Sequence, residues 1–469
     1  MNGRALLRAV IEHPEDDARR LVYADWLQQL GDPQGELIAV QTQLARATAA
    51  ERGELEARAK ALLEVHGAAW AAQLGEGVKD VAFRRGLAYA ARVPVGHGML
   101  EVLDRAPIRD LGFIAGTGDG DDDGDGDDDV GDGGNVPASG APRSTSRTAI
   151  ARELASDPRL ARVELLASGV RWGPTGLAAL LASPHLGNLR GLQIADPDCQ
   201  VYAGHALAAA ALPHLELLAL RGDWRAELGD AGVAALARAQ LPALRELALL
   251  NLGCGFAAAR ALATSPTLTG LHGLDLGWGS YNPNQIGPLG ATALAESANF
   301  TRLRRLILDF NGIGDDGLAA LAGSPHLEAM QYLSLKSASI TDDGLRALAA
   351  GRAMPALELL ELTFNRDITH AGVEALADSP RLATLTSLWL RQTSIGPEGA
   401  RALARSPHAC ALRSLNLLEC NLGDDGARAL LDSPHLDRLS ELQVSGNRLS
   451  EDIRAALHAR WGAAVHADR

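Results

Sequence analysis

The sequence predicts an α/β fold: a right-handed solenoid, shaped as a horseshoe, with parallel strands on the concave face and helices outside. Two observations predict it. Segments with two apolar residues two positions apart recur along the chain, which is the spacing of a strand with one buried face. Each segment is followed by Ala and Leu at helical spacing, and then by a proline or its equivalent every 24 to 32 residues from Pro158 to Pro434. A small all-α domain is expected to precede this stack of layers.

Residues 415–436 contain one complete unit of the repeat. Leu415 and Leu417 have the spacing of a short strand, and a helix follows from residue 423. Ser433-Pro434 ends this helix, because the residue before a proline is pushed out of the helical region. This unit resembles a leucine-rich repeat of the ribonuclease-inhibitor-like type, in which every repeat carries an outer helix. The resemblance implies a binding surface but names no partner.

Composition and charge narrow the classes of partner. The chain of 469 residues is 47% hydrophobic but only 4% aromatic, which is typical of a core of stacked Ala and Leu layers. Nine of the negative charges fall between Asp119 and Asp132, so a net charge of −14 leaves −5 for the rest of the chain. Because there is no basic excess, we expect neither nucleic acid nor an anionic membrane as a partner.

Cysteine usage and hydropathy predict a cytoplasmic protein. The four cysteines are dispersed, as in a reducing compartment. No signal peptide is expected, because the apolar run at residues 6–11 is short and charges follow it. The most apolar later stretch, residues 206–220, is interrupted by Pro213, His214 and Glu216, so no membrane span is expected. We expect a monomer.

Residues 1–80 form the predicted helical domain. Apolar residues at three- and four-residue spacing predict helices over 4–11, 17–30, 35–48 and 52–74, with Asp16 or Asp17 capping the second. The sequence PEDDARRLVYADWL at residues 14–27 is followed by Gly31-Asp32-Pro33 and Gln41. Over residues 5–46 this pattern resembles the bacterial repeat-companion domain, which precedes leucine-rich repeats in planctomycetes and myxobacteria. It departs at Gln34-Gly35, where relatives carry an arginine and an alanine, and the resemblance implies no biochemical role.

The predicted solenoid spans residues 81–446, about 11 to 12 repeats. Residues 81–93 are expected to form strands that cover its open edge, and Leu111 with Phe113 forms the first strand pair. An insertion at residues 114–147 then separates this strand from a helix at 148–155. The insertion is almost purely Gly, Asp, Ser and Pro, which cannot bury apolar area, and we expect it to be disordered.

The insertion leaves two interpretations open. Its acidic residues fall on positions one, three, five, nine and twelve of an EF-hand loop, with Gly126 at position six: Asp121, Asp123, Asp125, Asp129 and Asp132. The twelfth position is an aspartate where a bidentate glutamate is usual, and no flanking helices are expected. A solvated acidic loop is therefore one hypothesis, and a calcium-responsive module using residues 119–132 is the alternative.

The repeats follow one pattern as far as residue 446. The expected strand pairs are Leu192/Ile194, Leu218/Leu220, Leu247/Leu249, Leu274/Leu276, Leu306/Leu308, Leu333/Leu335, Leu360/Leu362, Leu388/Leu390, Leu415/Leu417 and Leu442/Val444. Asn311, Asn365 and Asn447 lie three residues past the second apolar residue, where an amide can satisfy backbone groups of the turn. Helices open with Gly or Thr at the N-cap and then Pro or Asp. Residues 447–469 are predicted to add a C-terminal capping helix.

No catalytic residue, cofactor or metal site is predicted in the repeats. Five histidines follow a helix-ending proline, at positions 185, 214, 326, 408 and 435. Residues in one repeat position form a row along an edge and do not converge on a metal. No nucleophile–base motif and no phosphate-cradling glycine loop is present.

The candidate binding residues lie between and just after the strand leucines, where side chains point away from the core. They are Arg221, Asp275, Trp278, Asp309, Phe310, Lys336, Glu361, Phe364, Trp389, Arg391, Asn416, Glu419 and Gln443. Aromatic residues and arginine on a surface of mixed charge are typical of protein-binding patches. The sequence therefore predicts a non-enzymatic module that binds an unidentified protein or peptide. A regulator of GTPases is a third hypothesis, by analogy with other repeat proteins of this type.

Overall fold

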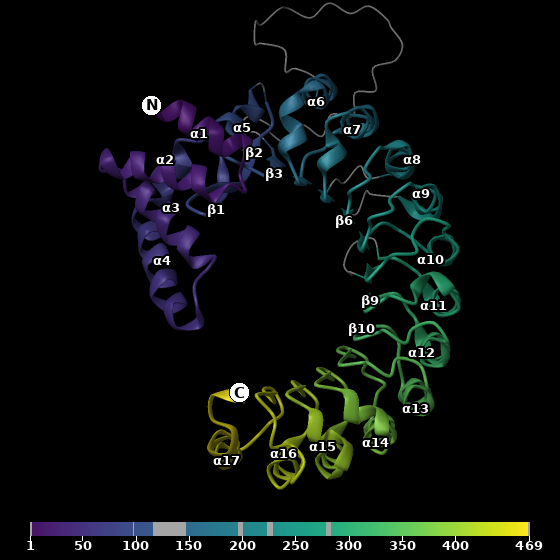
Figure 1. Cartoon of the computed structure of the whole chain (residues 1–469). Helices are drawn as coiled ribbons and strands as arrows, with labels where there is room; N and C mark the ends of the chain where they lie inside the picture. The colour runs from purple at the N-terminus through teal and green to yellow at the C-terminus, as the bar shows by residue number, and fades with distance from the viewer. Residues whose placement is uncertain are drawn as a thin grey trace, which may run out of the picture. The chain divides into compact units, whose positions relative to one another are not determined.

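The computed structural model describes residues 2–96, 98–115, 147–195, 200–222, 228–277 and 283–467. The chain forms two compact units, Met1–Ala195 and Asp196–Arg469. Both units combine helices with parallel strands (Figure 1). The predicted α/β solenoid with an N-terminal helical region is therefore confirmed. The predicted domain boundaries at residues 80 and 446 stay predictions.

The first unit begins with four helices. These are α1 (Gly3–Glu12), α2 (Asp17–Gln29), α3 (Pro33–Leu44) and α4 (Ala49–Ala72), close to the ranges expected from the sequence. Asp16 caps α2, because its carboxylate accepts the N–H groups of Ala18 and Arg19. Asp32 caps α3, whose first residue Pro33 has no N–H to leave unsatisfied.

The remaining elements of the first unit form its sheet and outer helices. They are β1 (Lys79–Arg84), β2 (Leu87–Pro94), α5 (Val102–Arg105), β3 (Asp110–Ile114), α6 (Arg147–Ser156), β4 (Leu165–Ser168), α7 (Gly173–Leu181) and β5 (Gly191–Ala195). Strand β1 pairs antiparallel with β2, and β2 to β5 pair in order as parallel strands. The sequence did not predict β4, because Ser168 replaces its second leucine. That hydroxyl instead accepts a hydrogen bond from the Trp172 indole at 2.7 Å.

The second unit repeats a strand and a helix in each layer. Its strands are β6 (Leu217–Arg221), β7 (Glu246–Leu250), β8 (Gly273–Asp275), β9 (Arg305–Ile307), β10 (Tyr332–Ser334), β11 (Leu359–Glu361), β12 (Ser387–Trp389), β13 (Ser414–Asn416), β14 (Glu441–Gln443) and β15 (Val465–His466). Its helices are α8 (Val201–Ala209), α9 (Gly229–Leu236), α10 (Phe256–Ala263), α11 (Gly287–Ala295), α12 (Gly314–Gly323), α13 (Asp342–Ala350), α14 (His370–Ala377), α15 (Gly396–Arg405), α16 (Gly423–Leu431) and α17 (Glu451–Trp461).

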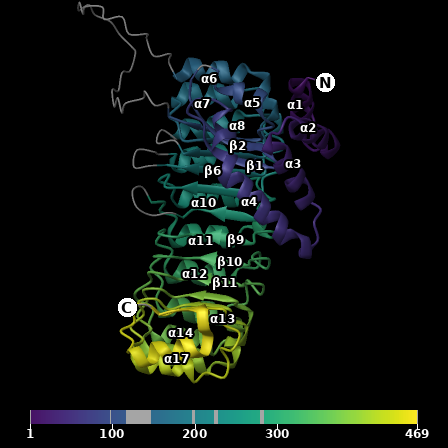
Figure 2. The same ribbon diagram turned by 90° about the vertical axis from the view of Figure 1, so that its left-hand side faces the viewer.

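Strands β6 to β15 form a continuous parallel ladder. One buried apolar residue of each strand lies beside that of the next, from Leu218 to Val465. Within this unit the layers follow an arc, with strands on its inner side and helices on its outer side (Figure 1), and Figure 2 shows the strands stacked one upon another. In this unit the first apolar residue of each predicted pair is confirmed in register, whereas from β8 to β14 the second lies one residue past the end of the strand. The sequence missed β15, because this two-residue strand lacks the leucine pair.

Buried asparagines join neighbouring layers. The Asn365 side chain donates to the carbonyls of Leu335 and Leu362, both at 2.8 Å. It also accepts the N–H groups of Ala338 and Ile340, both at 3.0 Å. One amide thus satisfies four backbone groups that the short strands leave unpaired. Asn284, Asn311 and Asn447 make equivalent bonds in other layers.

Serine side chains join neighbouring layers just after the C-terminal ends of most outer helices. The Ser433 hydroxyl donates to the Ala404 carbonyl of the preceding layer at 2.6 Å and accepts the His435 N–H at 3.2 Å. Ser183, Ser265, Ser297, Ser324, Ser379 and Ser406 repeat the bond to the preceding layer. This serine explains the Ser-Pro-His pattern: at His435 the backbone, and not the imidazole, makes the structural contact.

Most of the outer helices begin in one of two ways, with a threonine N-cap or with a glycine as the first helical residue. Thr341 is an N-cap, as predicted, and Thr369 is another. Asp342 of one layer accepts the Thr369 N–H at 2.7 Å and the Thr369 hydroxyl at 2.6 Å, so this acid ties two layers together. In the glycine form the helix includes the glycine itself; Gly396, for example, has φ +60°. Glycine is favoured there because it enters the left-handed region without a side-chain clash.

Replacing Asn365 with alanine tests the bonds between layers. The substitution leaves the Ala338 N–H, the Ile340 N–H and the Leu335 carbonyl without a partner, and an unsatisfied buried group costs about 1–3 kcal/mol. We expect the amides of Ala338 and Ile340 to exchange at least about tenfold faster in hydrogen-exchange mass spectrometry. Asn421→Gly is the matched control, because Asn421 is exposed and already has φ +58°. Equal protection in Asn365→Ala and the wild type would contradict this account.

Candidate functional site

The ladder places the predicted binding residues in rows on the inner side of the second unit. The last residues of successive strands lie side by side: Glu361 beside Trp389, Trp389 beside Asn416, and Asn416 beside Gln443. Adjacent strands are about 4.8 Å apart, so such side chains are in direct reach of one another. We call this surface the inner face. It comprises Arg221, Asp275, Asp309, Phe310, Lys336, Phe364, Trp389, Arg391, Asn416, Glu419 and Gln443.

Some of the candidates lie outside the described residues. Trp278 is one of them, and so are the calcium candidates Asp121, Asp123, Asp125, Asp129 and Asp132. Nowhere in the described part of the chain do three or more His, Cys, Asp or Glu side chains gather in the way a metal ion requires. The calcium hypothesis therefore stays a prediction.

Partly buried acids line the middle of the inner face. Asp309 accepts the Ser334 hydroxyl at 2.6 Å and the Lys336 N–H at 2.9 Å. Burial raises the pKa of Asp275, of Asp309 and of Glu361 above their ordinary values. The ammonium group of Lys336 lies 3.7 Å from the Glu361 carboxylate and is the cation of this group.

The prediction that the Glu361 side chain is exposed on the inner face was wrong. The sequence placed its side chain toward a ligand, but the residue is only 1% exposed. Its carboxylate turns back and accepts the Thr363 N–H at 2.9 Å, while Lys336 lies over it. A carboxylate in this position supports the inner face from below and does not contribute to its exposed surface.

Aromatic side chains and arginine lie next to these acids. Arg391 lies over the Phe364 ring, 5.5 Å from its centre, and 4.0 Å from the Glu419 carboxylate. The Trp389 indole donates to the Ser414 hydroxyl at 3.2 Å. Phe310 is 37% exposed, so its ring is accessible at the surface. These contacts hold large side chains in fixed orientations at the surface.

The backbone carries a repeated left-handed residue next to this group. Phe310 has φ +60°, Phe364 has φ +67° and Glu419 has φ +57°. Gly446 has the equivalent position in a later layer, with φ +70°. A residue with a side chain loses about 1–2 kcal/mol in this region, whereas glycine does not. Ser337 and Gln392 occupy the same left-handed position in the intervening layers, with φ +47° and +55°, so the cost is common to most layers. What distinguishes Phe310 and Phe364 is that a ring is placed at the surface from this position.

Buried thiols are poor nucleophiles here. Burial raises the pKa of Cys254 to about 12 and also raises that of Cys420. Both thiols are therefore protonated near neutral pH, and the thiolate is the reactive form.

The inner face presents aromatic, cationic and amide groups, which suit recognition.

A ladder of single parallel strands with one leucine-lined face, joined by buried asparagines, defines a leucine-rich-repeat solenoid. Comparison with protein families supports this class: four stretches match the family described as Leucine Rich repeat, at residues 301–322, 326–349, 381–404 and 408–431. All four lie in the second unit. The comparison with curated proteins found no match.

The solved structures that are similar to this chain include the following two. One is the crystal structure of the Rad7 and Elc1 complex in yeast, with 17% identity, 65% of this chain and 75% of that chain covered, and a TM-score of 0.43. The other is an internalin (inlF) from Listeria monocytogenes, with 19% identity, 67% and 76% covered, and a TM-score of 0.35. At these scores neither likeness supports an argument about function. In the described ranges no helix combines the length and the hydrophobicity that a bilayer span requires.

The buried acid Glu361 predicts a dependence of stability on pH. Burial raises its pKa above the ordinary 4.5, so the folded protein holds this proton more tightly than the unfolded chain does. The stability that this carboxyl contributes is therefore complete below about 4.5 and is lost as pH rises through the folded pKa. Glu361→Gln cannot ionise. We expect it to raise the free energy of unfolding at pH 7 relative to the wild type, and to give no gain near pH 4.

Urea unfolding followed by circular dichroism at several pH values measures this effect. Glu441→Gln is the control with the opposite sign, because the hydrogen bond from Ser414 lowers the pKa of Glu441. Its stabilising contribution is present above the unfolded pKa and is lost on acidification. This control should therefore be less stable than the wild type at pH 7. A Glu361→Gln variant that also loses stability at pH 7 would contradict the assignment.

Proposed function

We propose that this chain is a non-enzymatic interaction module that binds a protein or peptide partner on the inner face of the second unit. The observation that carries the proposal is the pair Phe310 and Phe364. Both rings reach the surface from left-handed positions, where glycine would be the low-energy choice. The left-handed position is common to most layers, and what distinguishes these two is that a ring is placed at the surface from it.

The surroundings of the two rings have the chemistry of a protein interface. Tryptophan, tyrosine and arginine dominate the residues that carry binding energy, and Trp389 and Arg391 lie in the layer beside Phe364. Arg391 is already held between a ring and a carboxylate. A side chain that is ordered before binding loses less conformational entropy when the partner arrives.

Charge on the inner face favours a partner of mixed polarity. Asp275, Asp309 and Glu419 provide acceptors, Lys336 and Arg391 provide cations, and Asn416 and Gln443 provide amides. Arg221 adds an exposed cation at the end of β6. We assign Glu361 the role of a buried support under Lys336 and not that of a contact.

Finer parts of the sequence interpretation belong to this proposal. Residues 5–46 are proposed to be a bacterial repeat-companion domain, within a helical domain of residues 1–80. The repeats are proposed to be of the ribonuclease-inhibitor-like type over residues 81–446, with a C-terminal cap at 447–469. A cytoplasmic location and a monomeric state stay predictions.

Phe364→Gly separates binding from folding. The glycine removes the ring and also relieves the left-handed backbone, so the two effects on stability oppose each other. We expect the free energy of unfolding to change by less than about 1 kcal/mol, while capture of the partner from native lysate falls at least about tenfold. Leu289→Ala is the matched control, because Leu289 is 67% exposed on the outer helix α11. Quantitative mass spectrometry of the captured proteins gives the comparison.

Charge reversal at Arg391 provides a second test of the same face. Arg391→Glu places a carboxylate beside that of Glu419 and removes the cation over Phe364. We expect the partner lost in Phe364→Gly to be lost here too, and Trp389→Ala to weaken it, with the far-UV spectrum unchanged. If every captured protein binds all three variants as it binds the wild type, the partner does not use the inner face.

A further inference from the structure

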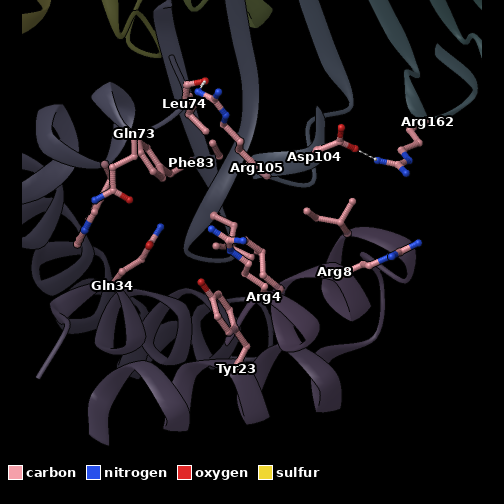
Figure 3. A pocket seen from close by; sticks show the side chains of 16 residues that line it. Arg4, Arg8, Tyr23, Gln34, Gln73, Leu74, Phe83, Asp104, Arg105 and Arg162 are labelled. Carbon is pink, nitrogen blue, oxygen red and sulfur yellow. Dashed lines mark hydrogen bonds and ion pairs between the residues drawn. The ribbon is translucent and has the colours of Figure 1, made fainter. Parts of the chain in front are cut away.

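A second candidate site lies in the first unit. A cavity of about 840 Å³ is lined by residues of α1, α2, α3, α4, β1, β2 and α5 (Figure 3). This volume is within the range of cavities that hold small molecules. All of the lining residues belong to this one unit.

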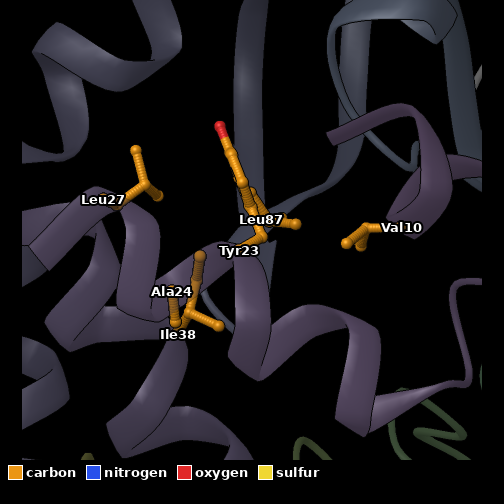
Figure 4. Close-up of a cluster of buried hydrophobic side chains, with 6 residues drawn as sticks. All are labelled: Val10, Tyr23, Ala24, Leu27, Ile38 and Leu87. Atoms are coloured by element: carbon orange, nitrogen blue, oxygen red, sulfur yellow. The ribbon is translucent and has the colours of Figure 1, made fainter. Parts of the chain in front are cut away.

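Part of the cavity wall is apolar and rigid. Trp70 is only 6% exposed and packs edge to face on Phe83, with ring centres 6.0 Å apart. Tyr23 has its ring in a buried cluster with Val10, Ala24, Leu27, Ile38 and Leu87. Figure 4 shows its hydroxyl pointing out of that cluster, and Figure 3 shows this hydroxyl directed into the cavity. Burial raises the pKa of Tyr23, so the phenol keeps its proton and is a hydrogen-bond donor.

Two arginines from different elements line this cavity. Arg4 comes from α1, and Figure 3 shows its guanidinium group near the middle of the cavity. Arg105 comes from α5, and its guanidinium group is directed toward Leu74, away from Arg4 (Figure 3). Arg105 is anchored, because it donates to the Leu74 carbonyl at 2.8 Å and pairs with Glu101 at 3.1 Å. Arg4 makes no ion pair with any described residue. Its charge is therefore the uncompensated charge of this cavity.

The other charged groups of the lining are already paired. Arg8 bonds to Glu12 at 2.9 Å, and Arg162 lies 3.3 Å from Asp104. Figure 3 shows Arg8 and Arg162 at the side of the cavity, apart from Arg4 and Arg105. The chain as a whole has a net charge of −14, but the charge in the middle of this cavity is positive. Walls of low dielectric focus the potential of such charges and attract ions of opposite sign.

The chemistry of the lining selects a class of ligand. Guanidinium groups bind carboxylate and phosphate oxygens through paired hydrogen bonds. The Tyr23 hydroxyl and the side-chain amides of Gln34 and Gln73 add neutral donors on neighbouring walls. Trp70 and Phe83 offer flat apolar surface, which an inorganic ion would not use. The combination suits an anionic group attached to an apolar body.

We propose that this cavity binds a small organic anion. Its carboxylate or phosphate group pairs with Arg4, and its apolar body packs on Trp70 and Phe83. This site is independent of the inner face, because its lining residues lie in the first unit and the inner face lies in the second.

Titration calorimetry of the full chain tests the ligand class. The probes are phenyl phosphate and phenylacetate, with phenylacetamide as the neutral analogue and inorganic phosphate as the anion without an apolar body. We expect at least one aromatic anion to bind with a dissociation constant below about 5 mM, and both comparison probes to bind at least about tenfold more weakly. The tighter of the two aromatic anions identifies the charged group. If neither binds below that value, or if phenylacetamide binds equally well, the proposal is overturned.

Arg4→Gln locates the binding. Arg4 is exposed and has no ion pair to lose, so the variant should fold with an unchanged thermal midpoint. We expect the affinity for the bound anion to fall about tenfold, because a charge-assisted hydrogen bond is lost. Arg52→Gln in α4 makes the same change of charge outside the cavity and should bind as the wild type does. Equal affinity of Arg4→Gln and the wild type places the anion elsewhere and overturns the proposal.

Discussion

The structure depends on hydrogen bonds that cross from one layer to the next. Most strands of the second unit have three residues, so each layer makes few backbone bonds of its own. Buried asparagine amides, serine hydroxyls and helix-cap acids satisfy the backbone groups left over at three places in a layer. Each such group would cost about 1–3 kcal/mol if it were unpaired. A layer therefore has a stable conformation only between two neighbours.

The inner face is a consequence of this stacking. Because the ladder fixes the register, side chains at one repeat position fall into rows, and a surface arises from residues about 27 positions apart. The same geometry forces a left-handed residue into most of these layers. In the layers that carry Phe310 and Phe364 this position presents a ring, next to Arg391 and Trp389. The rings of Phe310 and Phe364 thus occupy the repeat position at which the backbone is held in the left-handed region.

Much of the fold could be predicted because the same residue pattern recurs in layer after layer. The leucine pairs, the first four helices and the role of Asn365 followed from spacing. Single occurrences gave no such signal: Asn284 lies in a longer loop, Ser168 replaces a leucine, and β15 has no leucine pair. The burial of Glu361 depends on the orientation of one carboxylate. The cavity around Arg4 joins segments as far apart in the sequence as Arg4 and Arg162, which no local pattern records.

Site-specific photocrosslinking tests the central claim most directly, because it reports which side of the second unit touches a partner. A photoreactive amino acid would replace Asn416 on the inner face and, separately, Arg346 on the outer helix α13. The account predicts that one protein from native lysate is crosslinked at position 416 and not at position 346. Crosslinking at position 346 alone, or of the same proteins at both positions, would contradict it.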